Sequence, residues 1–128
     1  MENTKMTYEK LAERTETILY GPAGQKLAAT KTTRLLHAAM GFSTEAGEFM
    51  DAIKRFAYYD SPLDEENLAE ELGDILWYAA LAANALGTSF EKIQRANISK
   101  LRARYPKGFK DIDAQERNLN AERDALKK

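Results

Sequence analysis

The chain has 128 residues, of which 44% are hydrophobic and 30% are charged, and its net charge is -1 at neutral pH. This composition is typical of one globular domain, and it excludes an intrinsically disordered chain. The absence of cysteine excludes disulfides and thiolate zinc sites and suits a reducing compartment. No stretch reaches the roughly 20 apolar residues of a membrane helix, and the first residues carry no apolar targeting core. We therefore expect one cytoplasmic domain over residues 1–128.

Helical periods dominate the first half of the chain, and no run alternates long enough for a sheet, which predicts an all-α fold. The first amphipathic helix is expected over residues 8–19, before the Gly-Pro-Ala-Gly turn at 21–24. The second helix is expected to start at residue 26 or 33 and to end at residue 57. Its apolar residues recur at the spacing of a buried helix face. They are Leu35, Ala39, Phe42, Ala46, Phe49, Ile53 and Phe56.

The third helix is predicted to begin near Asp64 and to stop at Gly87, a residue type favoured just past a helix end. Every residue from Ile75 to Ala83 is apolar, so this helix needs neighbours on all sides. A chain this short cannot supply them all. We therefore expect a four- to five-helix bundle that is completed by oligomerisation.

The fourth helix is predicted to start at the capping box Thr88-Ser89-Phe90-Glu91, with Thr88 as the cap. It should end before Tyr105, because the proline at 106 disfavours helical geometry in the residue that precedes it. Residues 113–128 are polar with a thin apolar pattern, which predicts a single tail helix that is docked or frayed.

Charge is distributed unevenly along the chain. Residues 44–74 contain ten acidic and two basic residues, a balance of -8, whereas residues 92–110 contain seven basic residues and no acidic one. The first segment is therefore suited to holding a cation and the second to holding an anion.

Two pairs of carboxylates stand out within the acidic segment. Glu45 and Glu48 are three residues apart on the second helix, and Glu71 and Asp74 repeat this spacing on the third. Residues three apart leave a helix on the same face, and a short connection favours antiparallel packing of the two helices. The four carboxylates can then converge, and at about 4 Å each pair would repel by roughly 1 to 4 kcal/mol unless a cation lies among them. Hard oxygen ligands of this kind suit Mg²⁺ or Mn²⁺.

The basic segment also shows a helical stripe. Asn97, Lys100 and Arg104 share one line of the fourth helix with Phe90, Ile93 and Leu101. Two cations and an amide are thus expected to point toward the core side, where an unpaired charge is costly. We expect an anionic partner for them, such as the phosphates of a nucleotide.

These residues resemble the MazG-like, all-α nucleoside triphosphate pyrophosphohydrolases. The paired motif Glu45-Ala-Gly-Glu48 and Glu71-Leu-Gly-Asp74 carries the resemblance. It extends over residues 35–109, where Asn97-Ile-Ser-Lys100-Leu and Arg104-Tyr-Pro-Lys-Gly-Phe109 are similar to the single-domain branch found in phages and bacteria.

The resemblance implies a helical homodimer or homotetramer that hydrolyses a nucleoside triphosphate to the monophosphate and pyrophosphate. It implies Mg²⁺, or Mn²⁺, held by Glu45, Glu48, Glu71 and Asp74. One of the first two glutamates would orient or deprotonate the attacking water. Lys100 and Arg104 would stabilise charge on the leaving pyrophosphate, and Asn97 would bind a phosphate or the sugar. Tyr78 occupies the place of an aromatic residue that contacts the base in some relatives, although a core tyrosine has the same pattern.

Two alternatives stay open at this point. A phosphoribosyl-ATP pyrophosphohydrolase would share the metal motif with another substrate. A helical interaction module would use the basic segment on a partner or on nucleic acid, but the core-side direction of Lys100 and Arg104 makes nucleic acid the weaker expectation. The preferred base, the number of metal ions and the roles of His37 and Lys54 do not follow from the sequence.

Overall fold

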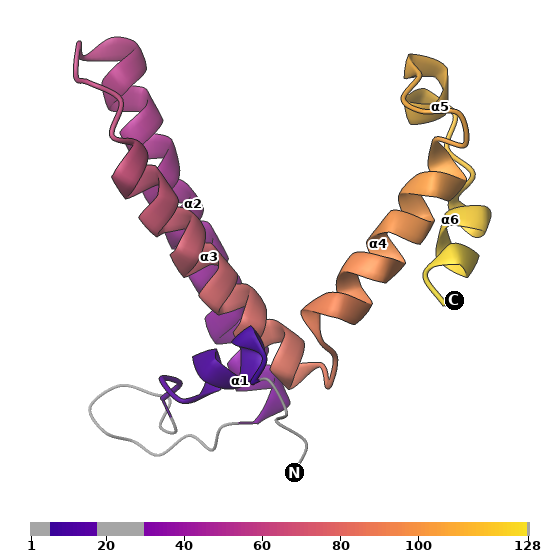
Figure 1. Cartoon of the computed structure of the whole chain (residues 1–128), viewed down its shortest axis with the longest axis horizontal. Coiled ribbons are helices and arrows are strands. Elements are labelled where there is room, and N and C mark those ends of the chain that lie inside the picture. The colour runs from indigo at the N-terminus through magenta and orange to yellow at the C-terminus, as the bar shows by residue number, and fades with distance from the viewer. Residues whose placement is uncertain (1–5, 18–29, 128) are drawn as a thin grey trace. The chain divides into compact units, whose positions relative to one another are not determined.

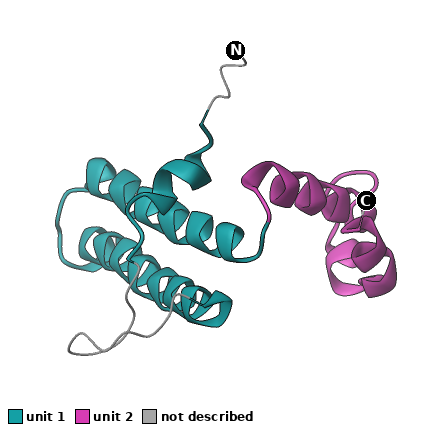
Figure 2. Ribbon diagram, turned by 90° about the horizontal axis from the view of Figure 1, so that it is seen from below, with its two compact units in different colours: residues 1–87 teal, residues 88–128 magenta. Residues whose placement is uncertain are grey.

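The computed structural model describes residues 6–17 and 30–127. In these ranges it contains six helices and no strand, which confirms the all-α prediction (Figure 1). They are α1 (Tyr8–Glu13), α2 (Lys31–Tyr58), α3 (Glu65–Ala85), α4 (Phe90–Arg104), α5 (Asp111–Gln115) and α6 (Leu119–Ala125). The chain divides into two compact units, residues 1–87 and 88–128, which Figure 2 colours separately. The single domain predicted over residues 1–128 stays a prediction.

The first unit is built on an antiparallel hairpin of α2 and α3, which lie side by side in Figures 1 and 2. The side chain of Thr30 accepts a hydrogen bond from the Thr33 amide at 3.2 Å and so caps α2. Asp64 caps α3 in the same way, through the Asn67 amide at 3.0 Å. Gly87 has a φ of 67°, the left-handed conformation that glycine adopts most easily, directly after the C-cap of α3. The predicted bounds of the third helix are therefore confirmed.

The face of α2 that packs on α3 differs from the predicted one. The buried residues of α2 are Ala38 and Gly41, whereas Phe42, Ile53 and Phe56 of the predicted stripe are exposed. The reason is steric. A Cβ built on Gly41 would overlap the ring of Tyr78, so this small face lets α3 approach closely. The large apolar side chains are left uncovered within the chain.

Helix α1 packs across the C-terminal half of α3. The Asn84 side chain donates to the Glu9 carbonyl at 3.0 Å, and the Trp77 indole N–H donates to the Thr15 hydroxyl at 2.7 Å. The first helix ends at Glu13, earlier than predicted, because the Thr15 amide and hydroxyl both bond to the Ala12 carbonyl and close a turn. The predicted helix end at residue 19, the turn at 21–24 and the alternative start at residue 26 lie outside the described residues.

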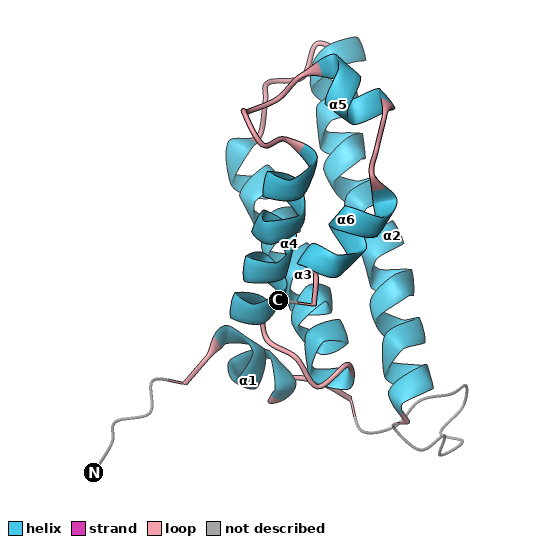
Figure 3. Ribbon diagram, turned by 90° about the vertical axis from the view of Figure 1, so that its right-hand side faces the viewer, coloured by secondary structure: helices cyan, strands magenta, loops and turns pink. Residues whose placement is uncertain are grey.

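The second unit consists of α4 with α5 and α6, and α6 packs against α4 (Figure 3). Ser89, not Thr88, caps α4, accepting from the Lys92 amide at 3.4 Å, because Ser89 is the last residue with extended backbone. The helix ends before Pro106, as predicted. The tail forms two short helices where one was predicted, since Asn118 starts α6 by capping the Ala121 amide at 3.1 Å.

The described residues contain few large buried side chains. Their buried apolar residues are Ala12, Ala38, Ala80, Leu81 and Ala83, four of them alanines. Several large apolar side chains are accordingly left exposed, and Leu36, Met40 and Met50 of α2 are more than half exposed.

No helix in residues 6–17 or 30–127 is both long enough and apolar enough to cross a membrane.

Candidate metal centre

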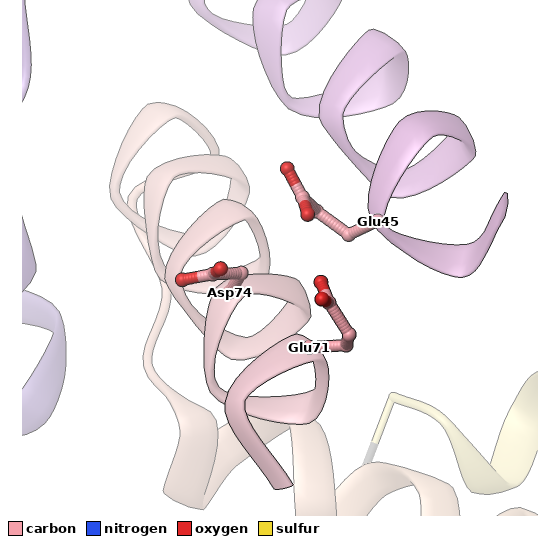
Figure 4. Close-up of side chains that lie close together, drawn as sticks. All are labelled: Glu45, Glu71 and Asp74. Atoms are coloured by element: carbon pink, nitrogen blue, oxygen red, sulfur yellow. The ribbon is translucent and has the colours of Figure 1, made fainter. Parts of the chain in front are cut away.

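Three of the four predicted metal ligands converge between α2 and α3. Glu45 comes from α2, and Glu71 and Asp74 come from successive turns of α3, as Figure 4 shows. One carboxylate oxygen from each lies within 4.8 Å of the others. The i, i+3 spacing on α3 and the antiparallel hairpin bring this group together, in agreement with the sequence argument.

Glu71 is the most enclosed member of the group, with 7% of its surface exposed. Its Oε1 accepts a hydrogen bond of 2.6 Å from the Asn67 side-chain amide, one turn earlier on α3. The backbone of Asn67 is itself held by the Asp64 cap. Sequence reasoning missed Asn67, although its i, i+4 relation to Glu71 was a visible signal.

The pKa of Glu45 is raised above its ordinary value, first by burial and then by the negative charges of Glu48, Asp74 and Glu71. The neighbouring Glu71 side chain raises this pKa further. A divalent cation would offset this repulsion and could bind several carboxylate oxygens at once. The donor set therefore fits a hard cation.

Glu48 lies at the edge of this group. It is exposed and lines a cleft of about 790 Å³ between α2 and the start of α3, together with Asp51, Arg55, Asn67 and Glu71. Its charge still acts on Glu45. Glu48 is thus a solvent-accessible side chain in the lining of this cleft. Lys54, which the sequence left without a role, pairs with Asp51 at 2.9 Å.

An aromatic cluster flanks the carboxylates on the other side. The rings of Trp77 and Tyr78 are in edge contact, with centroids 5.1 Å apart, and His37 contacts both of them. Trp77 and Tyr78 line a second cleft with Thr15, Glu45 and Asp74. Tyr78 also packs on Gly41, so it has a packing role and borders a cleft beside the carboxylates.

The predicted phosphate ligands lie in the second unit. Asn97 is exposed, contrary to the expected core-side direction, whereas Lys100 and Arg104 are partly buried. Arg104 has an anionic partner within the chain, since its Nη2 lies 2.7 Å from a carboxylate oxygen of Glu122 in α6. The sequence indicated an anion beside Arg104 but not Glu122, which is 18 residues away on a different helix.

Comparison with known proteins points in one direction. The family description "MazG nucleotide pyrophosphohydrolase domain" matches residues 35–109, more than half of the chain and all of the site in the first unit. The Gene 37 protein of Mycobacterium phage L5 is 32% identical over 97 residues, which cover 73% of this chain and 82% of the phage protein. No solved structure matches the chain. The chain belongs to the family of MazG nucleotide pyrophosphohydrolase domains.

Proposed function

We propose that this protein hydrolyses a nucleoside triphosphate to the monophosphate and pyrophosphate, with a divalent cation. The observation that carries the proposal is the convergence of Glu45, Glu71 and Asp74 in a chain of the MazG family. Such an enzyme would remove canonical, non-canonical or deoxy nucleotides from the nucleotide pool of the cytoplasm.

The cation is Mg²⁺, with Mn²⁺ as a substitute, because the available donors are carboxylate oxygens. Glu45, Glu71 and Asp74 would hold it, and Glu48 would complete the set from the edge of the cleft. The bound cation supplies charge neutralisation at the triphosphate and a more acidic water.

Other side chains of the two units take the remaining roles. Glu48 or Glu45 accepts a hydrogen bond from the attacking water and orients it, and the solvent exposure of Glu48 favours that residue. Tyr78, beside Trp77, provides an aromatic edge for the base in the second cleft. Asn97, Lys100 and Arg104 bind phosphate oxygens or the sugar, and the two cations stabilise the leaving pyrophosphate.

Assembly is part of the proposal. The α2–α3 hairpin leaves large apolar side chains exposed, which is expected of a homodimer or homotetramer. No membrane partner is invoked, and nucleic acid is the weaker alternative.

The test is a panel of canonical, deoxy and damaged nucleoside triphosphates, assayed with Mg²⁺, with Mn²⁺ and with EDTA. We expect pyrophosphate as the first product and no turnover in EDTA. Phosphoribosyl-ATP belongs in the same panel, because it separates the proposed activity from the related pyrophosphohydrolase. Orthophosphate as the primary product would reject attack between the α and β phosphates.

A further inference from the structure

Two arginines converge on one buried carboxylate in the second unit. Arg104 Nε and Nη2 lie 2.9 and 2.7 Å from the Glu122 oxygens, and the same two nitrogens of Arg117 lie 3.3 and 2.7 Å away. Each guanidinium therefore binds the carboxylate with two parallel hydrogen bonds. Glu122 is 4% exposed, and the Arg104 and Arg117 side chains are 17% and 43% exposed.

This group carries a net charge of +1 and a fixed array of donors. Each guanidinium has five N–H donors in a plane, and two of them point at Glu122. The pair of arginines is a receptor for an oxyanion, and phosphate groups match forked guanidinium donors as well as a carboxylate does. A phosphate also offers more oxygens and more charge than one carboxylate.

We propose that Arg104 and Arg117 form a binding site for the terminal phosphates of pyrophosphate or of a nucleoside triphosphate, and that Glu122 occupies this site as an internal substitute in the free chain. When the phosphate binds, it displaces Glu122 and releases α6 from α4. The inference rests on the proposed function in one respect: it takes Arg104 as a phosphate ligand. It adds Arg117 as a second ligand and Glu122 as a competitor.

Helix α6 is suited to such an exchange because it is short and its large apolar side chains are mainly exposed. It has seven residues, too few for a stable isolated helix. Its apolar side chains Leu119 and Leu126 are 62% and 46% exposed. The other charged pair at this end of the chain, Asp124 with Lys127, joins two exposed neighbours and does not reach α4. Docking of α6 therefore depends strongly on Glu122.

The first experiment compares pyrophosphate binding to three variants by calorimetry, in EDTA and at constant ionic strength. Glu122→Gln removes the competitor and should bind pyrophosphate at least about tenfold more tightly than wild type, because the apparent affinity rises with the fraction of free sites. Asp124→Asn removes the same charge from the same helix and should bind as wild type. The double variant Glu122→Gln/Arg117→Gln should lose the gain. Equal affinity of Glu122→Gln and Asp124→Asn would overturn the proposal.

The second experiment uses the wild-type chain and needs no variant to fold. Pyrophosphate should accelerate amide hydrogen exchange of residues 119–125, and sodium chloride at the same ionic strength should not. Unchanged or slower exchange in α6 would show that the phosphate does not displace Glu122. Neither experiment involves hydrolysis or metal, so both can be interpreted even if the protein shows no activity. Conversely, if the protein is active but pyrophosphate does not change amide exchange in α6, this inference is rejected while the proposed function stands.

Discussion

Glu71 is the residue on which the candidate metal centre depends most. It is buried, it accepts a hydrogen bond from the Asn67 side-chain amide, and its carboxylate lies close to that of Glu45 on the neighbouring helix. Asp74, by contrast, is exposed, and its carboxylate can turn toward solvent. A buried carboxylate beside two others is costly unless a proton or a cation neutralises part of the charge. Removing the charge of Glu71 should therefore raise the stability of the metal-free protein and weaken the binding of a metal ion.

The variant Glu71→Gln should melt at a higher temperature than wild type without metal, because a neutral side chain of the same shape relieves the repulsion. It should lose about 100-fold or more of the activity, since even residues behind a ligand contribute about 10- to 100-fold. Added Mg²⁺ should raise the melting temperature of wild type but hardly that of the variant. Glu70→Gln is the matched control, because Glu70 is the exposed neighbour on α3. Equal responses of all three proteins to Mg²⁺ would show that Glu71 is not a ligand.

A second prediction concerns Asn67, which holds the Glu71 carboxylate through a 2.6 Å hydrogen bond. Asn67→Ala leaves the backbone cap at Asp64 in place, so the start of α3 should persist. The apparent affinity for Mg²⁺ should fall by about 10- to 100-fold, the usual effect of losing such a supporting bond. A Mg²⁺ titration of activity measures it, with Asn120→Ala at an exposed position as the control. An unchanged midpoint would mean that Asn67 contributes nothing to the site.

At the scale of the elements, the close contact of α2 with α3 depends on Gly41. The ring of Tyr78 occupies the space that a Cβ would need, and it is flanked by His37 and Trp77. Gly41→Ala should therefore destabilise the fold by roughly 1 to 3 kcal/mol, the usual cost of overpacking. Gly47→Ala, where nothing lies within 4 Å, should instead stabilise it by about 0.5 to 1 kcal/mol. Chemical denaturation should show that the free energy of unfolding falls in Gly41→Ala and rises in Gly47→Ala. An unchanged free energy of unfolding in Gly41→Ala would contradict the contact between Gly41 and Tyr78.

The sequence predicted where these helices begin and end better than it predicted which of their faces pack together. Asp64 and Gly87 mark α3 because capping depends on a few adjacent residues. The buried face of α2 was predicted wrongly, since hydrophobicity favoured Phe42, Ile53 and Phe56 while the steric fit of Gly41 with Tyr78 selected another face. The predicted convergence of Glu45 with Glu71 and Asp74 is found, because it depends on i, i+3 spacing and on a short helix connection.

Contacts across long sequence separations could not be predicted in this way. Glu122 is 18 residues from Arg104 and lies on a different helix, and Thr15 is 62 residues from Trp77. No period links such residues, and their pairing depends on how the helices dock.

Docking of α6 should depend on pH through Glu122. The two guanidinium groups lower the pKa of Glu122 from 4.5 to about 2, with Arg104 the larger cause. Because the pKa is depressed in the folded state, the stabilisation is complete above about 4.5 and is lost as the pH falls toward about 2. Amide exchange of residues 119–125 should rise over this window in wild type. It should already be fast and nearly pH-independent in Glu122→Gln, after correction for intrinsic exchange. Asp124→Asn should follow wild type, and a flat wild-type profile would contradict the link.

At the scale of the whole molecule, the distribution of apolar surface is unusual for a lone subunit. The exposed large apolar side chains of α2 and α3 are Leu36, Met40, Phe42, Met50, Ile53, Phe56, Tyr58, Leu72 and Leu76. The buried apolar residues of the described ranges are mostly alanines. Each Å² of apolar surface removed from water contributes about 25 cal/mol to stability. A second copy that covers these side chains would therefore stabilise the folded hairpin beyond what its small internal core provides.

The last prediction follows from that surface. Wild type should sediment as a dimer or tetramer at micromolar concentration, and its melting temperature should rise with protein concentration, because unfolding is coupled to dissociation. Ile53→Lys places a charge beside the exposed Phe56 side chain of α2 and should shift the protein toward monomer and lower its melting temperature. Ala103→Lys, an equal charge change at an exposed position of α4, should leave both properties unchanged. A wild-type chain that sediments as a well-folded monomer, with a melting temperature independent of concentration, would show that the hairpin is stable without a partner.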